Sequence, residues 1–414
     1  MSTVALAFMV YELTGSVLHM GAVMAVSTFP LVITSWIGGA FLDRFSAKKV
    51  MVLSDVARAV LIFALPFLAE QSVSAIYVVG CFMGVASAFF NPGQMKLVGE
   101  MIDRAHLVKA NSYVSISQTG AELAGYLMGG VVVTAAGYMP AFLANAGTYL
   151  VSALLLLGLP SVARRTEQVQ KVTALIAESP AVFVKLWRHP GLRTNLLIAI
   201  FPIVAFMMAS PNSYGLALDV FDRGAAGVAA LEVSIACGMI VGGLIISRST
   251  LQVDKNLYVF FSILLMSICL VGIYFSPYFW LSIGLMGVAG VANVGMFVPS
   301  ITMFQEVPAE AERGRLMAVR AGFGQVGSTA GLLLGGVLGV ALGITRVFLV
   351  AGVAAIVLST LIYVPYSIGA RRRAQAAWAA AMASGSTRES AREAAQRAAI
   401  SGSGSAWTAT MEGA

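Results

Sequence analysis

The amino-acid sequence predicts an all-α membrane protein of about twelve transmembrane helices, arranged as two six-helix bundles. Three observations support this fold class. Hydrophobic residues make up 58% of the 414 residues and charged residues only 11%, whereas soluble domains contain about 25% charged residues. Apolar stretches of about 20 residues, enough to cross the hydrocarbon core of a bilayer, recur along the chain. Finally, the second half of the chain repeats features of the first.

The same composition excludes several classes of protein. The charged residues are too few to cover the surface of a soluble enzyme, and the chain is too hydrophobic to be disordered, with a mean hydropathy of +0.86. The three cysteines have no paired spacing, so we expect neither a disulfide framework nor a metal site. The sequence also lacks the phosphate-binding loop of ATPases and any nucleophile motif. We therefore expect no enzymatic activity and no cofactor.

The transmembrane spans can be assigned in chain order from the apolar stretches. An apolar fragment, Ser2–Leu13, comes first. As a helix it would reach about 18 Å, short of the roughly 30 Å of a hydrocarbon core, so we expect that the first helix is truncated at its N-terminal end in this chain. Eleven full spans follow: Met20–Leu42, Val50–Ala69, Val73–Phe90, Ser112–Ala136, Met139–Leu159, Leu192–Leu218, Ala225–Ser247, Leu257–Phe275, Tyr278–Val298, Leu316–Leu342 and Thr345–Tyr366.

Basic residues alternate between the loops and set the expected orientation. Lys and Arg gather in every second loop, and only Arg223 and Arg346 fall on the opposite side. Since cytoplasmic loops carry the excess of Lys and Arg, we expect a multi-pass protein of the cell inner membrane whose basic loops are cytoplasmic. The net charge of +7 is then loop charge and does not indicate a nucleic-acid partner.

Four segments are expected from this assignment. An N-terminal six-helix half would occupy residues 1–160, with its first helix incomplete, and a cytoplasmic central loop residues 161–191. A C-terminal six-helix half would occupy residues 192–368. Residues 369–414, rich in Ala, Ser, Gly and Arg, would form a mostly disordered cytoplasmic tail.

An internal repeat relates the two halves. Glu100 and Glu306 lie 206 residues apart. The same offset relates three pairs of glycines: Gly125 and Gly331, Gly129 and Gly335, and Gly130 and Gly336. Two equivalent halves joined by a basic loop are typical of transporters built from parallel repeats.

A glycine, an aspartate and several basic residues stand where the span Met20–Leu42 ends. The segment reads Gly39-Ala-Phe-Leu-Asp43-Arg44-Phe-Ser-Ala-Lys48. Judged by charge alone, it is an ordinary positive cytoplasmic loop. Its spacing resembles the signature that the major facilitator superfamily carries between helices 2 and 3. The resemblance implies the two-bundle fold of that superfamily and a conformational latch in which Gly39, Asp43, Arg44 and Lys48 brace the two halves.

Glycines in the span Ser112–Ala136 resemble a second signature of this superfamily. Gly125, Gly129 and Gly130 match its antiporter signature, with Tyr126 in place of the proline. The resemblance favours export over import. The alternative is ordinary close packing of helices through small residues.

Three further short sequence segments resemble one branch of the superfamily. They are Val10–Ser16, Leu53–Ala59 and Leu186–Pro190. These short segments are similar to sequence motifs of the enterobactin-exporter and macrolide-efflux branch, also described as transmembrane secretion effectors. The resemblance extends from about Val4 to Tyr366 and therefore covers both halves.

Two acidic residues lie inside apolar spans. Glu122 lies about 20 Å from the cytoplasmic end of its span and Glu232 about 14 Å from the outer end of its own. A charged group at that depth costs several kcal/mol unless it is paired or hydrated, so each is a functional candidate. The resemblance places the two helices side by side between the halves, where the carboxyls could share a proton for coupling or bind a cationic substrate. The alternative is that Ser or Tyr neighbours simply hydrogen-bond each of them.

Other polar residues inside the spans have two interpretations. Gln118, Tyr126, Asn145 and Asn293 are candidates to line a cavity, and each could instead form a hydrogen bond between helices. Asp55 and Arg58 are three residues apart and can pair on one helix face, which we interpret as a structural ion pair.

The favoured function is that of a secondary active transporter. It would export an amphiphilic small molecule, a drug or a siderophore, by alternating access in exchange for protons. Such a role corresponds to multidrug resistance or siderophore export, in a chain expected to be a monomer whose other partner is the lipid bilayer. An importer or facilitator of the same fold is one alternative, and a non-transporting membrane sensor or scaffold is the other.

Overall fold

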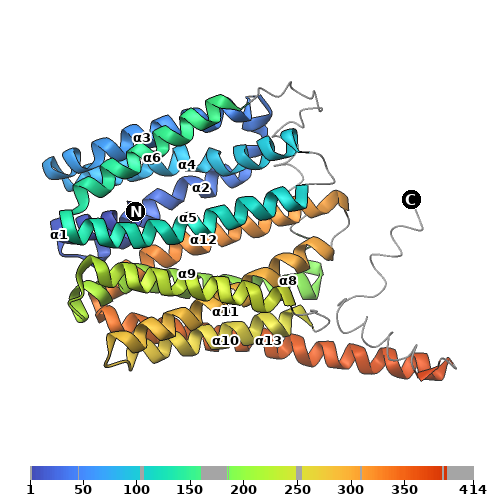
Figure 1. The fold of residues 1–414 in the computed structure, drawn as a ribbon. Helices are drawn as coiled ribbons and strands as arrows, with labels where there is room; N and C mark the ends of the chain where they lie inside the picture. The colour runs from blue at the N-terminus through green and yellow to red at the C-terminus, as the bar shows by residue number, and fades with distance from the viewer. Residues whose placement is uncertain are drawn as a thin grey trace.

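Figure 1 shows the computed structural model of the chain, a bundle of long helices that run side by side. It describes residues 2–44, 46–102, 107–159, 184, 186–248, 254–307, 310–384 and 387–388. No strand occurs in those residues. The all-α fold class predicted from the sequence is confirmed.

Each expected span coincides with one helix. The first bundle, defined as α1–α6, consists of α1 (Ser2–Thr14), α2 (Val17–Arg44), α3 (Ala47–Gln71), α4 (Val73–Met101), α5 (Leu107–Ala136) and α6 (Tyr138–Gly158). The second bundle, defined as α8–α13, consists of α8 (Pro190–Gly215) with a π-helical turn η2 (Leu216–Val220), α9 (Gly224–Arg248), α10 (Lys255–Tyr274), α11 (Phe279–Glu306), α12 (Glu310–Leu342) and α13 (Ile344–Ala383). Within the described residues, nine helices are long and apolar enough to cross a membrane, and shorter apolar stretches lie in α1, α2 and α5.

Helix boundaries repeat along the chain with the offset found in the sequence. α4 begins at Val73 and α11 at Phe279, which are 206 residues apart. Gly137 and Gly343, again 206 residues apart, directly precede α6 and α13 and have φ values of 79° and 90°. This left-handed region favours glycine, because a Cβ would be strained there. The internal repeat is therefore visible in the backbone as well as in the residues.

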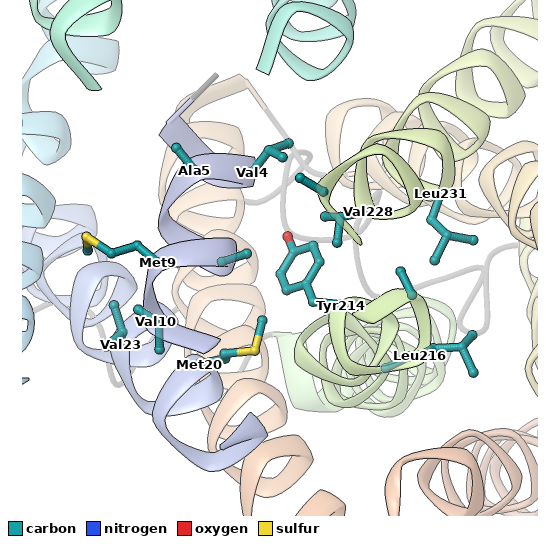
Figure 2. Packing of buried hydrophobic residues seen from close by; sticks show 14 of the residues in the cluster. Val4, Ala5, Met9, Val10, Met20, Val23, Tyr214, Leu216, Val228 and Leu231 are labelled. Atoms are coloured by element: carbon teal, nitrogen blue, oxygen red, sulfur yellow. The ribbon is translucent and has the colours of Figure 1, made fainter. Parts of the chain in front are cut away.

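The two bundles are packed in the same way. In the first bundle α3 packs against α4 and α6, and in the second α10 packs against α11 and α13. Likewise α2 packs against α4, and α9 against α11. The largest apolar core contains residues of both bundles, and Figure 2 shows its part between α1, α8 and α9. Close packing of this kind drives helix association in lipid, where neighbouring helices gain little from the hydrophobic effect.

The bundles meet along two helix pairs, α2 with α12 and α5 with α9. A Cβ on Gly21 of α2 would lie 2.6 Å from the carbonyl oxygen of Leu332 and 3.1 Å from the Cα of Gly336, both in α12. A Cβ on Gly130 of α5 would overlap the side chain of Ala229 in α9. These contacts lie at the end of the molecule where α2 and α9 begin, which we call the closed end. Only glycine permits such close backbone approach.

The C-terminal helix is longer than the sequence predicts. A mostly disordered tail is expected from residue 369 onward, but α13 continues as one helix to Ala383, so the expectation is wrong for residues 369–383. Figure 1 shows this end of α13 projecting past the other helices. The physical reason is that residues 371–383 are mainly Ala and Arg, which are strong helix formers, with no Gly or Pro to end the helix. Residues 389–414 lie outside the described residues.

Candidate functional site

A carboxyl group and a phenol of the second bundle meet where α9 faces the first bundle. Glu232 on α9 is partly buried, and its carboxyl is hydrogen-bonded by the hydroxyl of Tyr214 on α8. Tyr214 is 3% exposed, and Ser210, one turn earlier on α8, hydrogen-bonds the same hydroxyl. Figure 2 shows the Tyr214 hydroxyl pointing into the space between α1 and α9. Ser210 and Tyr214 therefore hold the Glu232 carboxyl in place.

The first bundle contributes a second acid and a second phenol. Tyr126 on α5 is partly buried and interacts electrostatically with the carboxyls of both Glu122 and Glu232. Glu122 precedes Tyr126 by four residues, so the two side chains share one helix face. Both acids predicted from the sequence thus act electrostatically on one phenol, across the α5–α9 contact. We call Glu122, Tyr126, Tyr214 and Glu232 the acid–tyrosine cluster.

The acid–tyrosine cluster lies near mid-depth. Glu232 lies eight residues into α9, about 12 Å from its start, and Glu122 fifteen residues into α5, about 22 Å from its start. Tyr214 was not singled out by sequence reasoning. The signal that could have found it is the polar run Ser210-Pro-Asn-Ser-Tyr214 inside an apolar span.

α5 is packed differently on the two sides of this cluster. Toward the closed end, Gly129 and Gly130 are buried, while Gly120, Ala121 and Glu122 are exposed. Three successive residues point in three directions around a helix. The stretch beginning at Gly120 is therefore open on several sides, and the cluster stands at the boundary between this open part and the closed end.

The cavity-lining candidates are not all brought together. Gln118, exposed on α5 one turn from Glu122, donates from Nε2 to Oε1 of Gln94 on α4 at 2.9 Å. Asn145 lies on α6, which packs mainly against α3, and its buried Nδ2 atom has no hydrogen-bond partner among the described residues. Asn293 is partly buried on α11. Of these candidates, Tyr126 is part of the acid–tyrosine cluster and Gln118 lies beside it.

The predicted latch falls at the ends of α2 and α3. Gly39, Asp43 and Arg44 are in the last turns of α2, and their side chains lie outside the described residues. Lys48 donates from Nζ to the carbonyl oxygens of Leu157 at 2.9 Å and Leu159 at 2.5 Å. A cation at the carbonyls of the last turn stabilises the C-terminal end of α6. Both contacts are within the first bundle, and the latch between the halves stays a prediction.

One glycine of the second signature, Gly130, lies on the contact between the bundles. Gly125 is partly buried, and Gly129 and Gly130 are buried. A Cβ on Gly130 would overlap Ala229 and approach the carbonyl oxygen of Ala225 at 3.7 Å. Gly130 therefore serves the close packing of α5 on α9, and the antiporter role of the three glycines stays a prediction.

An apolar hollow of about 730 Å³ lies on the outer surface of the same contact. It is lined by residues of α5, α9 and α11, among them Leu127, Val131, Val233 and Trp280. Trp280 is 74% exposed. Leu127 and Val233 are the chain neighbours of Tyr126 and Glu232, so an apolar surface and a polar cluster adjoin along one helix pair.

Asp55 and Arg58 on α3 form a buried ion pair. Ser152 on α6 donates to Oδ2 of Asp55 at 2.6 Å. The Arg58 guanidinium also lies 4.2 Å from the ring centre of Phe90 and 4.7 Å from that of Tyr149. The pair therefore ties α3 to α4 and α6 and stands apart from the acid–tyrosine cluster.

Replacing Asp55 by Asn is expected to destabilise the protein by roughly 3–5 kcal/mol, because it leaves the Arg58 cation buried without its counter-charge. Thermal unfolding of the purified protein measures the effect. The double variant Asp55→Leu with Arg58→Met removes both charges and should recover most of the loss. Equal stability of the single variant and the wild type would contradict a structural role.

Comparison with known proteins assigns the chain to a family. The sequence profile of the Major Facilitator Superfamily matches residues 1–257 and 253–409. The chain is 26% identical over 382 residues to the MFS-type transporter YfiS of Bacillus subtilis, covering 88% of each chain. It is 26% identical over 365 residues to the multidrug efflux pump Tap of Mycolicibacterium fortuitum (84% of this chain, 87% of Tap), and 20% identical over 354 residues to macrolide efflux protein A of Streptococcus pyogenes (84% and 87%).

A solved structure shows the same fold. The crystal structure of the nucleoside transporter NupG matches with a TM-score of 0.64 at 16% identity and covers 87% of this chain and 94% of NupG. The all-α bundle, the sequence profile and these relatives agree. The chain belongs to the Major Facilitator Superfamily and is a multi-pass membrane transporter, not an enzyme.

Proposed function

We propose that this transporter exports an amphiphilic small molecule in exchange for protons, by alternating access. The observation that carries the proposal is the acid–tyrosine cluster between the bundles. Glu232 has a neutral hydrogen-bond donor, Tyr214, as its partner. An acid held by a phenol in an apolar span can gain and lose a proton without breaking an ion pair. Such a group suits a carrier that takes up a proton from one side and releases it to the other.

The position of the cluster fits alternating access. Glu122 and Tyr126 belong to the first bundle and Tyr214 and Glu232 to the second. A rocking motion of the bundles would therefore change the surroundings of Glu232 and with them its affinity for a proton. The close packing at Gly21 and Gly130 and the open stretch near Gly120 fit a state closed on one side. With the basic loops taken as cytoplasmic, this is the state open to the cytoplasm, in an inner membrane.

The substrate class follows from the surfaces around the cluster. The two acids of the cluster favour a cationic or hydrogen-bonding head, and the apolar hollow of about 730 Å³ beside the cluster favours a hydrophobic body. The names of two relatives, a multidrug efflux pump and a macrolide efflux protein, support an outward direction.

Transport by the purified full chain in proteoliposomes tests the proposal. The vesicles would contain a trapped pH indicator and be offered a panel of macrolides, siderophores and cationic dyes. We expect a substrate gradient to drive proton movement in the opposite direction. Substrate flux without proton movement would contradict the exchange and favour a facilitator. An absence of counterflow with every compound in a correctly folded sample would favour a sensor or scaffold.

A further inference from the structure

A second group of polar side chains lies at the end of the second bundle opposite the closed end. There α8 and α10 begin, and α13 leaves its apolar span near Tyr366. Arg373 follows two helical turns later, and its guanidinium lies 6.0 Å from the ring centre of Tyr366. This group is remote from the acid–tyrosine cluster and plays no part in the proposed exchange.

Three buried polar atoms in this group have no hydrogen-bond partner in the described part of the chain. They are the hydroxyl oxygen of Tyr366 and the Nε and Nη2 atoms of Arg373. Tyr366 is only 8% exposed. Buried polar groups are nearly always satisfied, and each exception costs free energy. The two unsatisfied nitrogens of Arg373 therefore indicate a missing acceptor close to Tyr366.

The polar neighbours in the described residues are already engaged. Asn256 accepts from Asn195 at 2.8 Å and donates to the carbonyl oxygen of Gly191 at 3.2 Å, and its side chain also interacts with the Tyr366 hydroxyl. Asp254 accepts from the backbone N–H of Asn256 at 3.0 Å and so caps the start of α10.

His189 is also engaged, because its Nδ1 accepts from the backbone N–H of Leu192 at 3.2 Å and caps α8. Burial lowers the pKa of His189, and the charge of Arg373 lowers it further. His189 therefore stays neutral at pH 7, and Arg373 is left as the unpaired cation of this group.

The geometry of the free donors selects the chemistry of the acceptor. Nε and Nη2 form one edge of the guanidinium, and their parallel N–H groups fit two oxygens of a phosphate or a carboxylate. The first turn of the 26-residue helix α8 lies close by, and its dipole adds positive potential. The Tyr366 hydroxyl supplies a further donor.

The position of the site relative to the membrane indicates which molecule supplies that anion. Tyr366 ends the last apolar span, so the site lies where the membrane meets water. Arg371 and Arg372, both exposed, add charge at the same level. Basic pockets between transmembrane helices at this level bind lipid head groups. We propose that Arg373 and Tyr366 bind the phosphate of an anionic phospholipid.

The test compares two neighbouring arginines in the full chain. Wild type, Arg373→Gln and Arg372→Gln would be placed in nanodiscs of phosphatidylcholine with and without phosphatidylglycerol. Both variants lose one positive charge, but only Arg373 has the buried free edge. Retained phosphatidylglycerol is counted by native mass spectrometry, and stability is read from thermal unfolding. We expect Arg373→Gln to lose about tenfold or more in lipid retention, since it loses the charged donor of the hydrogen bonds to the phosphate, and Arg372→Gln to resemble the wild type.

Two further conservative variants distinguish a specific loss of lipid binding from a loss caused by misfolding. Arg373→Lys keeps the charge but lacks the paired N–H edge, and Tyr366→Phe keeps the ring but lacks the hydroxyl; both should weaken retention. Equal retention by the Arg372 and Arg373 variants would overturn the site. So would a wild type that phosphatidylglycerol does not stabilise, or one that inorganic phosphate in detergent stabilises equally. None of these readouts depends on transport.

Discussion

Replacing Glu232 by Gln is expected to abolish substrate-driven proton movement while leaving the protein folded in the membrane. The amide fills the same space and can still accept from Tyr214, but it cannot carry a proton. Glu122→Gln should weaken coupling less, because Glu122 is exposed and Glu232 is held by a buried phenol. Tyr214→Phe should give an intermediate defect, since it removes the hydrogen bond and keeps the acid.

The measurement is the trapped pH indicator signal in proteoliposomes, alongside substrate counterflow. Glu70→Gln is the matched control, because Glu70 is an exposed acid at the end of α3. Glu70→Gln should show the same substrate-driven proton movement as the wild type. If Glu232→Gln and Glu122→Gln both retain normal proton movement, the acid–tyrosine cluster does not carry the proton. Loss of proton movement with retained counterflow would support a carrier role specifically.

Replacing Gly21 by Leu is expected to hold the two bundles apart at the closed end and to slow transport. Even a Cβ at this position would lie 2.6 Å from the backbone oxygen of Leu332. Removing this steric clash requires movement of α2 or α12. Overpacking of this kind costs about 1–3 kcal/mol. A cost confined to one of two conformations shifts their ratio by about 5- to 150-fold.

The rearrangement can be detected at a buried neighbour. In a background in which Cys81, Cys237 and Cys269 are replaced, a cysteine at Val17 should react slowly with a maleimide, because Val17 is 6% exposed. Gly21→Leu should speed that reaction. Gly147→Leu is the control, since among the described residues no atom of another helix lies within 4 Å of a Cβ there. Unchanged labelling and transport in the Gly21 variant would show that the closed end tolerates the side chain and is not a gate.

The helices were predictable from the sequence because each is set by local composition. An apolar segment that crosses the bilayer must pair its backbone N–H and C=O groups within the protein. A helix is the structure in which a single segment can form all of these hydrogen bonds by itself. The end of α13 was mispredicted for the opposite reason. Residues 371–383 look like part of a polar tail, but their alanines continue a helix that is already nucleated.

The candidate site was predictable only in part. Glu122 and Glu232 stand out because an acid in an apolar span is costly. Tyr214 does not, since tyrosine is common in apolar spans, and its role depends on which helix faces it. The free edge of Arg373 is likewise invisible in the sequence, where three successive arginines look equivalent.

The sequence by itself determined the number, order and membrane character of the helices and their 206-residue repeat. Those properties depend on composition and on spacing along one chain. Only the tertiary structure decided which acid meets which phenol, which glycines close the bundles and which arginine lacks a partner. The physical reason is that these properties depend on contacts between helices far apart in sequence, and a helix presents the same residues whichever neighbour it packs against.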